Sequence, residues 1–302
     1  SPVLWRKLPG ARSAGRVQSV ALRLVCDREL EIEKFVAKEY WSILAKLATP
    51  RNEVFEARLV GADGQKIQRL DIGSGAEAEA FTRDLENATF KVTSVEAKPA
   101  RRNPPPPFTT STMQQEASRK LGFAPAVAMR LAQRLYEGVE IDGEATGLIT
   151  YMRTDSPRIS QEATDEARQL IRDRFGADYL PASPNVYKTQ KAAQEAHEAI
   201  RPTSAFRDPE SVKQFLERDH YQLYKLIWNR FVASQMTPAI LEMTRVDCVP
   251  LDTPEAYVFR ANGTVMKFAG HTIVYREGTD VEVRAHRLRA RVDFHQPPHG
   301  LS

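Results

Sequence analysis

Residues 103–110 read NPPPPFTT, and this proline run separates segments of different periodicity. Four consecutive prolines cannot continue a helix, because each lacks a backbone N–H and fixes φ near about −65°. We therefore predict a stiff linker and a domain boundary at this run. Two helices are expected directly after it, TSTMQQEASRKLG (110–122) and APAVAMRLAQRLYEG (124–138), and Gly138 is expected to end the second.

The segments before the linker alternate like half-buried strands. Three have a two-residue period: YWSILAKL (40–47), EVFEARLV (53–60) and FKVTSVEAKP (90–99). A short helix is expected at 74–87. Ahead of them, residues 13–35 predict a helix with Ser13 as its N-cap.

Helical patterns continue after the linker to about residue 236. We expect a loop at 140–147, a helix at 161–175 and one long amphipathic helix at 211–236. Strand patterns return from Ala239, in the segments 239–249, 256–263, 264–270 and 271–278. Strands, a helical insertion and further strands predict a multidomain α+β chain, in which an all-α domain interrupts a β-rich domain.

The net positive charge of the chain is compatible with binding to a polyanion. The 302 residues carry a formal net charge of +4 and no apolar run long enough to suggest a membrane helix. Basic residues cluster at three places: Arg6, Lys7, Arg12 and Arg16; Lys98, Arg101 and Arg102; Arg284, Arg287, Arg289 and Arg291. Cys26 and Cys248 form no zinc-type pair and are interpreted as reduced, buried thiols. The first residues lack a signal-peptide core and an initiator Met, so we expect the chain to be part of a longer polypeptide.

One segment pairs a tyrosine with an arginine. Residues 147–160 read GLITYMRTDSPRIS. A phenol ionises near pH 10 and becomes a useful nucleophile only where positive charge stabilises the developing phenolate. If the segment is extended, Tyr151 and Arg153 point the same way. Short polar groups able to bond a phosphate or position a water follow: Thr154, Asp155 and Ser156. The alternative is a strand tyrosine whose hydroxyl is already satisfied.

A second segment, QEAHEAIRPT (194–203), offers a histidine. His197, Glu198 and Arg201 have helical spacing, with Pro202 ending the turn. His197 is a candidate cation near a phosphate, or a proton donor to a leaving oxygen. A surface histidine paired with an acid is the alternative.

A third segment, GARSAGRVQS (10–19), combines small and basic residues. Small side chains let a backbone approach a polyanion, and the free N–H groups of a helix start would join Arg12, Arg16 and Gln18 in a phosphate-binding corner. A plain capped helix explains the same small residues equally well.

These three segments, with FTTSTMQQEAS (108–118) and RFVASQMTPA (230–239), resemble bacterial type IA DNA topoisomerase I. The five motifs occur in the family's order and cover nearly the whole chain, and the Tyr-Met-Arg-Thr-Asp-Ser run is highly specific. The resemblance implies an enzyme that relaxes negatively supercoiled DNA without ATP, by a transient 5′-phosphotyrosine link.

The resemblance also implies residue roles. Tyr151 matches the nucleophile, Arg153 its phosphate-stabilising partner, and His197 a residue that helps to bind DNA or assists cleavage. The expected DNA-binding residues are Arg12, Ser13, Ala14, Gly15, Arg16, Val17, Gln18 and Arg201.

The family forms a torus of four domains. By resemblance, residues 1–36 belong to the helical cleft domain, 37–107 and 236–290 to the β-rich arch, and 108–235 to the helical domain that carries the tyrosine. Residues 291–302 are a truncated or divergent return towards the cleft domain.

The chain departs from the family in its metal ligands. The family holds Mg²⁺ in a Toprim domain with a D-x-D-x-E cluster, and no D-x-D occurs here. We expect no metal bound by this chain and no activity from it alone. The expected partners are single-stranded and negatively supercoiled DNA, with no membrane contact, and the protein is expected to be a cytoplasmic monomer.

Two other kinds of function are alternatives to a topoisomerase. A non-catalytic single-stranded DNA clamp would keep the toroidal scaffold without forming covalent links. A tyrosine recombinase needs a distributed Arg-His-Arg set, and a relaxase needs a histidine triad. Neither pattern occurs in the sequence.

Overall fold

The structure is a computed structural model, and it describes residues 16–85, 88–187, 197–253 and 256–277. The chain divides into two compact units. One comprises residues 1–91, 248–260 and 289–302, and the other comprises 92–247 and 261–288. The division falls inside three long strands rather than at the proline run. The mixture of a sheet and helices confirms the expected α+β class.

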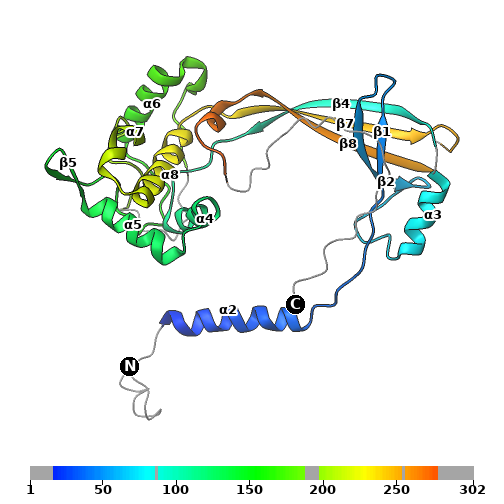
Figure 1. Ribbon diagram of the computed structural model, residues 1–302, viewed down its shortest axis with the longest axis horizontal. Coiled ribbons are helices and arrows are strands. Elements are labelled where there is room, and N and C mark those ends of the chain that lie inside the picture. The colour runs from blue at the N-terminus through cyan, green and yellow to red at the C-terminus, as the bar shows by residue number, and fades with distance from the viewer. Residues whose placement is uncertain (1–15, 86–87, 188–196, 254–255, 278–302) are drawn as a thin grey trace, which may run out of the picture. The chain divides into compact units, whose positions relative to one another are not determined.

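The sheet has the strand order β1-β2-β8-β7-β4, with β3 added on β2 (Figure 1). The strand bounds are β1 Leu44–Ala48, β2 Val54–Ala62, β3 Gln65–Lys66, β4 Phe90–Arg102, β7 Ala239–Pro250 and β8 Tyr257–Phe268. Strands β1 and β2 pair antiparallel from Leu44↔Arg58 to Ala48↔Val54. Strand β2 also pairs antiparallel with β8, and the register shifts between Leu59 and Gly61. Val60, between these two residues, is the extra residue of this irregularity, as in a β-bulge.

The first unit also contains helices α2, Arg16–Glu33, and α3, Gly75–Leu85. Helix α3 contacts β8 through the edge-to-face pair of Phe81 and Tyr257, whose ring centroids are 5.9 Å apart. The Tyr257 hydroxyl donates a 2.8 Å hydrogen bond to Asp84. The apolar residues of α2 are exposed, including Val17, Val20 and Leu24.

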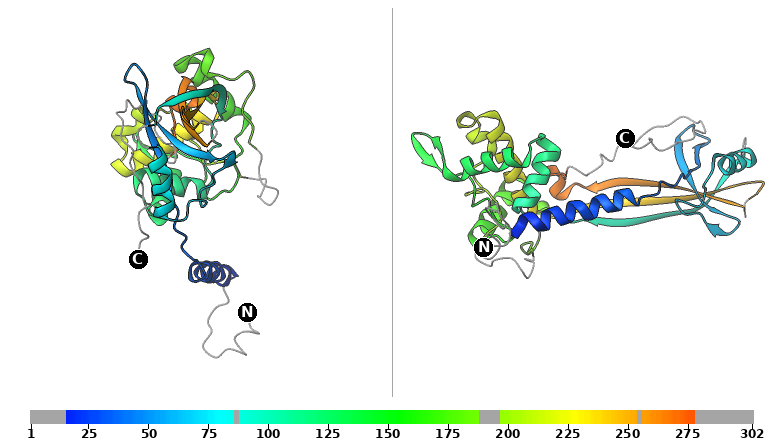
Figure 2. Two further views of the ribbon diagram at one scale, coloured as in Figure 1. Left: turned by 90° about the vertical axis from the view of Figure 1, so that its right-hand side faces the viewer. Right: turned by 90° about the horizontal axis from the view of Figure 1, so that it is seen from below.

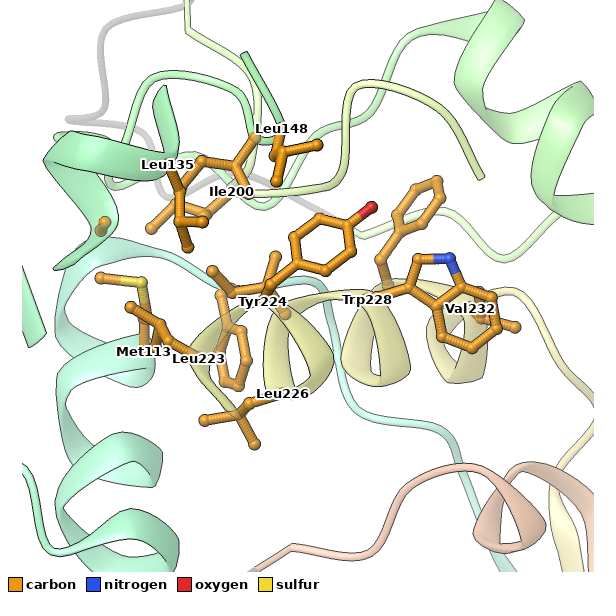
Figure 3. Close-up of a cluster of buried hydrophobic side chains, with 14 of the residues drawn as sticks. Met113, Leu135, Leu148, Ile200, Leu223, Tyr224, Leu226, Trp228 and Val232 are labelled. Carbon is orange, nitrogen blue, oxygen red and sulfur yellow. The ribbon is translucent and has the colours of Figure 1, made fainter. Parts of the chain in front are cut away.

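The second unit gathers the other helices into one group, which all three views show (Figure 2). The bounds are α4 Thr110–Leu121, α5 Pro125–Glu137, α6 Gln161–Phe175, α7 Pro209–Val212 and α8 Arg218–Ser234, with 3₁₀ turns η1 Ala177–Tyr179, η2 Lys213–Phe215 and η3 Gly270–Ile273. Helix α8 lies at the centre of their core, where Tyr224 and Trp228 are buried. Figure 3 shows both rings on α8 among side chains from the surrounding elements.

Two polar clusters join α8 to the segments around it. Arg230 is buried and donates to the Pro106 carbonyl at 2.6 Å, to the Tyr275 hydroxyl at 3.1 Å and to Glu277 at 2.9 Å. The Ser234 carbonyl accepts from the Tyr187 hydroxyl at 2.8 Å and from the Asn185 amide at 2.9 Å. The second cluster also reaches the proline run, because the Tyr187 hydroxyl lies 3.2 Å from the Pro104 carbonyl.

Several expected elements differ from the structure. The helix expected over 211–236 is broken, because Leu216 takes an extended backbone and packs, partly buried, against the core. The expected loop at 140–147 is instead part of a hairpin, β5 Val139–Ile141 with β6 Glu144–Thr146. Its turn residues Asp142 and Gly143 have φ of 52° and 87°, which is the backbone of a two-residue hairpin turn.

The end of the sheet also differs. The segments expected at 256–263 and 264–270 form one continuous strand, β8. The segment after it was expected to be a strand and begins as the turn η3. Gly270 there has φ of +50°, and a Cβ at this position would overlap the Pro238 carbonyl. This close crossing explains why the chain cannot stay extended.

Candidate functional site

Backbone hydrogen bonds hold the tyrosine segment beside two other segments. An antiparallel bridge joins Ile149 to Pro202, and a second joins Ile200 to Phe108. The Thr150 amide donates to the Arg201 carbonyl at 2.9 Å. Residues far apart in sequence therefore form a short sheet-like arrangement directly before Tyr151.

Buried side chains anchor the same segment. Leu148 is fully buried, and Figure 3 shows it beside Leu135 of α5 and Ile200. The Leu148 amide also donates to the Leu135 carbonyl at 2.8 Å. Burial of such side chains stabilises by about 1.5–3 kcal/mol each, so the position of the segment is fixed before the tyrosine is reached.

Exposure alternates along the segment after Leu148. Tyr151, Arg153 and Asp155 are exposed, whereas Met152 and Thr154 between them are buried. The backbone bends at Met152 within this segment. Tyr151 and Arg153 are both exposed on either side of this bend, and a common direction of their side chains stays a prediction.

Thr110, at the start of α4, fixes the backbone on both sides of Arg153. Its hydroxyl donates to the Met152 carbonyl at 2.7 Å and lies 3.0 Å from the Thr154 carbonyl. It also accepts from the Thr154 amide at 2.9 Å. The capped N-terminus of α4, with Thr109 as N-cap, supplies a rigid base for these bonds.

The short polar residues after Arg153 were interpreted as able to bond a phosphate or position a water, and two of them are not accessible at the surface. Thr154 and Ser156 are buried. Ser156 donates its amide to the Thr154 hydroxyl at 3.1 Å, so the latter satisfies the chain's own backbone. Asp155 alone of the three is exposed.

The Tyr151 ring lies against two other rings. Its centroid is 5.4 Å from that of Tyr136, with the planes at 66°, and 5.9 Å from that of His197, with the planes at 38°. The residue is 39% exposed. Within the described part of the chain its hydroxyl has no hydrogen-bond partner, so the alternative of a satisfied strand tyrosine finds no support there.

The two arginines predicted for the site differ in their partners. Arg153 is exposed and has no ion pair with any described residue. Arg201 is 14% exposed at its side chain and bonds Glu198 twice, at 2.9 and 2.6 Å. It also donates to the Pro202 carbonyl at 2.9 Å. Among the described residues, the Arg153 guanidinium thus has no anionic partner, whereas the Arg201 guanidinium is paired with the Glu198 carboxylate.

The histidine segment is not helical, and the expected helical spacing of His197, Glu198 and Arg201 is wrong. Residues 197–202 are extended and take part in the two bridges, because backbone pairing to Thr150 replaces a helical turn. His197 is half-buried and pairs with the Tyr151 ring rather than with an acid among the described residues.

The third predicted segment lies mostly outside the described residues. This applies to Arg12, Ser13, Ala14 and Gly15, including the predicted N-cap. Arg16 is the first residue of α2, and Val17 and Gln18 are exposed on its first turn. The DNA-binding role of these residues and of Arg201 stays a prediction.

Sequence reasoning missed three residues that shape the site. They are Tyr136, Thr110 and Thr150, and the last donates its hydroxyl to the Ala199 carbonyl at 2.7 Å. The motif FTTSTMQQEAS contains Thr110 but does not indicate its partner 44 positions away. Nothing in the sequence indicates a role for Tyr136 except its place in an expected helix.

The described residues contain no group of three or more His, Cys, Asp or Glu able to hold a metal ion. They also contain no helix that is long and apolar enough to cross a membrane. Of the cysteines, Cys248 is buried, but Cys26 is exposed on α2, contrary to expectation.

Among the described residues, the site combines an exposed tyrosine without a hydrogen-bond partner, a histidine ring next to it and, two positions along the chain, an arginine without an ion pair. These are the groups that an attack on a phosphate ester needs. The family model for DNA topoisomerase matches residues 1–290, and the chain therefore belongs to the bacterial type IA DNA topoisomerase family. The DNA topoisomerase 1 of Rickettsia bellii is 50% identical over 283 residues, which cover 93% of this chain and 35% of that protein. The DNA topoisomerase 1 of Xylella fastidiosa strain 9a5c is also 50% identical, over 93% of this chain and 34% of its own length.

A solved structure of a topoisomerase I is also similar to this chain. The full-length topoisomerase I of Thermotoga maritima superposes with a TM-score of 0.75 at 35% identity, covering 99% of this chain and 48% of that one. The chain thus spans about a third of the length of the curated relatives it matches.

Proposed function

We propose that the chain carries the nucleophile of a type IA DNA topoisomerase, which relaxes negatively supercoiled DNA without ATP. The observation that carries this proposal is that Tyr151 is exposed and its hydroxyl has no hydrogen-bond partner among the described residues. Two positions further on, Arg153 is exposed and has no ion pair with any of these residues. Membership of the family supports it.

The proposed reaction is a reversible transesterification. The Tyr151 oxygen attacks a DNA phosphorus and forms a bond to the phosphate that remains on the 5′ end of the cut strand. The bond from this phosphorus to the 3′ oxygen of the other end breaks. The phenolic proton leaves as the oxygen attacks, and a proton reaches the departing 3′ oxygen. One phosphodiester replaces another, so resealing needs no external energy, and superhelical strain drives the net relaxation.

Arg153 and His197 are the residues proposed to assist this reaction, through contact with the phosphate or through transfer of a proton. A guanidinium offers fixed donors to the phosphate oxygens as negative charge grows on them. His197, with its ring beside that of Tyr151, either binds the DNA near the break as a cation or passes a proton to the leaving oxygen.

Single-stranded DNA is the proposed substrate, because a paired strand could not enter a cleft that reads one backbone. The segment Arg12–Gln18 and Arg201 are proposed to contact this strand. Helical residues 108–235 form the proposed gate domain that lifts away from a β-rich arch made of 37–107 and 236–290, with 1–36 in the cleft domain. The protein is proposed to act as a monomer beside cytoplasmic DNA.

Mg²⁺ belongs to the proposed whole enzyme rather than to this chain. The described residues present no cluster of carboxylates that fits such an ion. The family holds it in a Toprim domain, and we assign no step on this chain to the metal.

The test uses a chimaera, in which this chain replaces the matching third of the Rickettsia bellii DNA topoisomerase 1. The chimaera should retain an end-labelled, nicked oligonucleotide on a denaturing gel, and Tyr151→Phe should abolish this adduct while oligonucleotide affinity stays within about twofold. The substitution removes only one exposed hydroxyl, so its effect on folding is within about 0.5 kcal/mol. Adducts that persist in Tyr151→Phe would refute the proposed nucleophile.

The alternative function, a single-stranded DNA clamp, predicts a different result. A clamp would bind the oligonucleotide without any covalent link, in the chimaera as in the isolated chain. A chimaera that binds DNA tightly and never forms an adduct would favour the clamp.

A further inference from the structure

We infer that Tyr136 is a positioning residue, whose ring fixes the orientation of the Tyr151 phenol for attack on phosphorus. The inference rests on the proposed role of Tyr151 as nucleophile. It goes beyond that role by assigning a function to a helix residue that no motif marks.

The backbone of Tyr136 is locked to the nucleophile segment. Tyr136 lies in the last turn of α5, and the chain then leaves through the β5–β6 hairpin and returns at Gly147. A Cβ on Gly147 would lie only 2.9 Å from the Tyr136 carbonyl oxygen, so the two backbones touch. The adjoining bond from the Leu148 amide to the Leu135 carbonyl keeps this register.

The ring of Tyr136 uses this fixed base to contact Tyr151. The pair is edge-to-face, with centroids 5.4 Å apart and planes at 66°. This geometry matches the favoured arrangement of aromatic rings. Tyr136 is itself 41% exposed, and its hydroxyl has no partner within the described residues, so core packing does not account for its position.

The second neighbour of Tyr151 also belongs to an anchored segment. His197 is the second ring beside Tyr151, and it belongs to the segment that Thr150 ties down through the Ala199 carbonyl and the Arg201 amide. Two rings from two anchored segments therefore contact one phenol.

Positioning matters because an exposed tyrosine otherwise samples several staggered rotamers. Attack needs the phenolic oxygen in line with the leaving oxygen, and populating one orientation raises the rate without new chemistry. The ring of Tyr136 should supply this restriction, whereas its hydroxyl should be dispensable.

The experiment compares Tyr136→Phe with Tyr136→Leu in the chimaera. Tyr136→Leu should slow single-turnover cleavage by roughly 3- to 10-fold, the range expected for loss of one aromatic pair, while oligonucleotide affinity and melting temperature hold. Tyr136→Phe should restore the full rate. The matched control is Phe206→Leu, which removes another exposed ring of the helical unit and should leave cleavage unchanged.

Each other outcome overturns the inference. Equal cleavage by the leucine and tyrosine forms shows that the ring is not needed. Weaker oligonucleotide binding by Tyr136→Leu, with cleavage unchanged at saturation, assigns Tyr136 to stacking on a base instead.

A spectroscopic readout separates this inference from the proposed function. In the chain labelled with fluorotyrosine, the Tyr151 resonance, assigned through Tyr151→Phe, should shift in Tyr136→Leu and not in Phe206→Leu. Absence of that shift refutes the ring contact even if the chimaera forms adducts. Absence of adducts with the shift present refutes the proposed function alone.

Discussion

At the residue scale, identical side chains in neighbouring segments have different roles. The Arg153 guanidinium is free among the described residues, whereas that of Arg201 is bonded twice to Glu198. We expect Arg153→Ala in the chimaera to slow cleavage about 100-fold, the effect typical of one lost transition-state donor, with the melting temperature unchanged. Arg201→Ala should instead lower the melting temperature, because it leaves Glu198 without its partner. The reverse pattern in melting and cleavage assays would contradict these assignments.

Thr110 provides a second test at this scale. Thr110→Val keeps the shape of the side chain but removes the hydroxyl that bonds Met152 and Thr154. Since buried backbone groups then lose their partner, unfolding free energy should fall by about 1–3 kcal/mol. Cleavage should fall as well, because the backbone around Arg153 loosens. Thr110→Ser keeps the hydroxyl and should stay close to wild type in both denaturant melts and cleavage assays.

The exposure of Tyr151 and Arg153 could be predicted from the sequence, because alternation along a segment is local information. The partners of Thr154 could not, since Thr110 lies 44 positions away and only folding brings the two together. The paired rings of Tyr136 and Tyr151 depend in the same way on a hairpin that was expected to be a loop.

At the scale of elements, most helices follow their patterns. Helix α6 has the bounds that were expected, with Ser160 bonding the Ala163 amide as N-cap. The expected elements are wrong where the local hydrophobic pattern and a contact between distant residues favour different structures. Leu216, inside the helix expected over 211–236, has an extended backbone and packs against the core. The segment after β8, expected to be a strand, begins as η3, where Gly270 lies close to Pro238.

The buried Arg230 is the element-scale test of stability. It links α8 to the proline run and to the segment after η3, and it lies over the Phe108 ring at 4.9 Å. Arg230→Ala should cost about 1–3 kcal/mol of unfolding free energy, because the Pro106 carbonyl and the Tyr275 hydroxyl lose a hydrogen-bond donor. Arg218→Ala, an exposed arginine on the same helix, should cost less than about 0.5 kcal/mol. Equal denaturant midpoints for the two variants would contradict this role.

Alkaline pH tests the same cluster. Burial raises the pKa of the Tyr275 hydroxyl, and its 2.6 Å hydrogen bond to Glu116 raises that pKa further. The unfolded tyrosine ionises near about pH 10, so the stabilisation is complete below that pH and is lost as pH rises towards the folded pKa. Unfolding free energy should fall above about pH 10, and Tyr275→Phe should reduce the slope of this fall in denaturant melts. An unchanged slope would contradict burial of the hydroxyl.

At the scale of the whole molecule, the chain holds about a third of its relatives' length. We expect the isolated chain to bind single-stranded DNA weakly and not to relax plasmids. Because basic side chains would displace counterions, affinity should fall steeply between 50 and 200 mM salt, by roughly 10-fold or more. Fluorescence anisotropy with a labelled oligonucleotide measures this fall, and plasmid relaxation by the pure chain would contradict the expectation.

The way the nucleophile segment is anchored separates folding from reactivity. Main-chain bonds and the inward-facing Leu148, Met152 and Thr154 hold the segment, while the outward-facing Tyr151 and Arg153 contribute little to holding it. Substitutions of these outward-facing residues should therefore yield well-folded proteins that no longer cleave DNA but still bind it. In a cell such variants would escape quality control and compete with the active enzyme, so a single lesion could be dominant rather than silent.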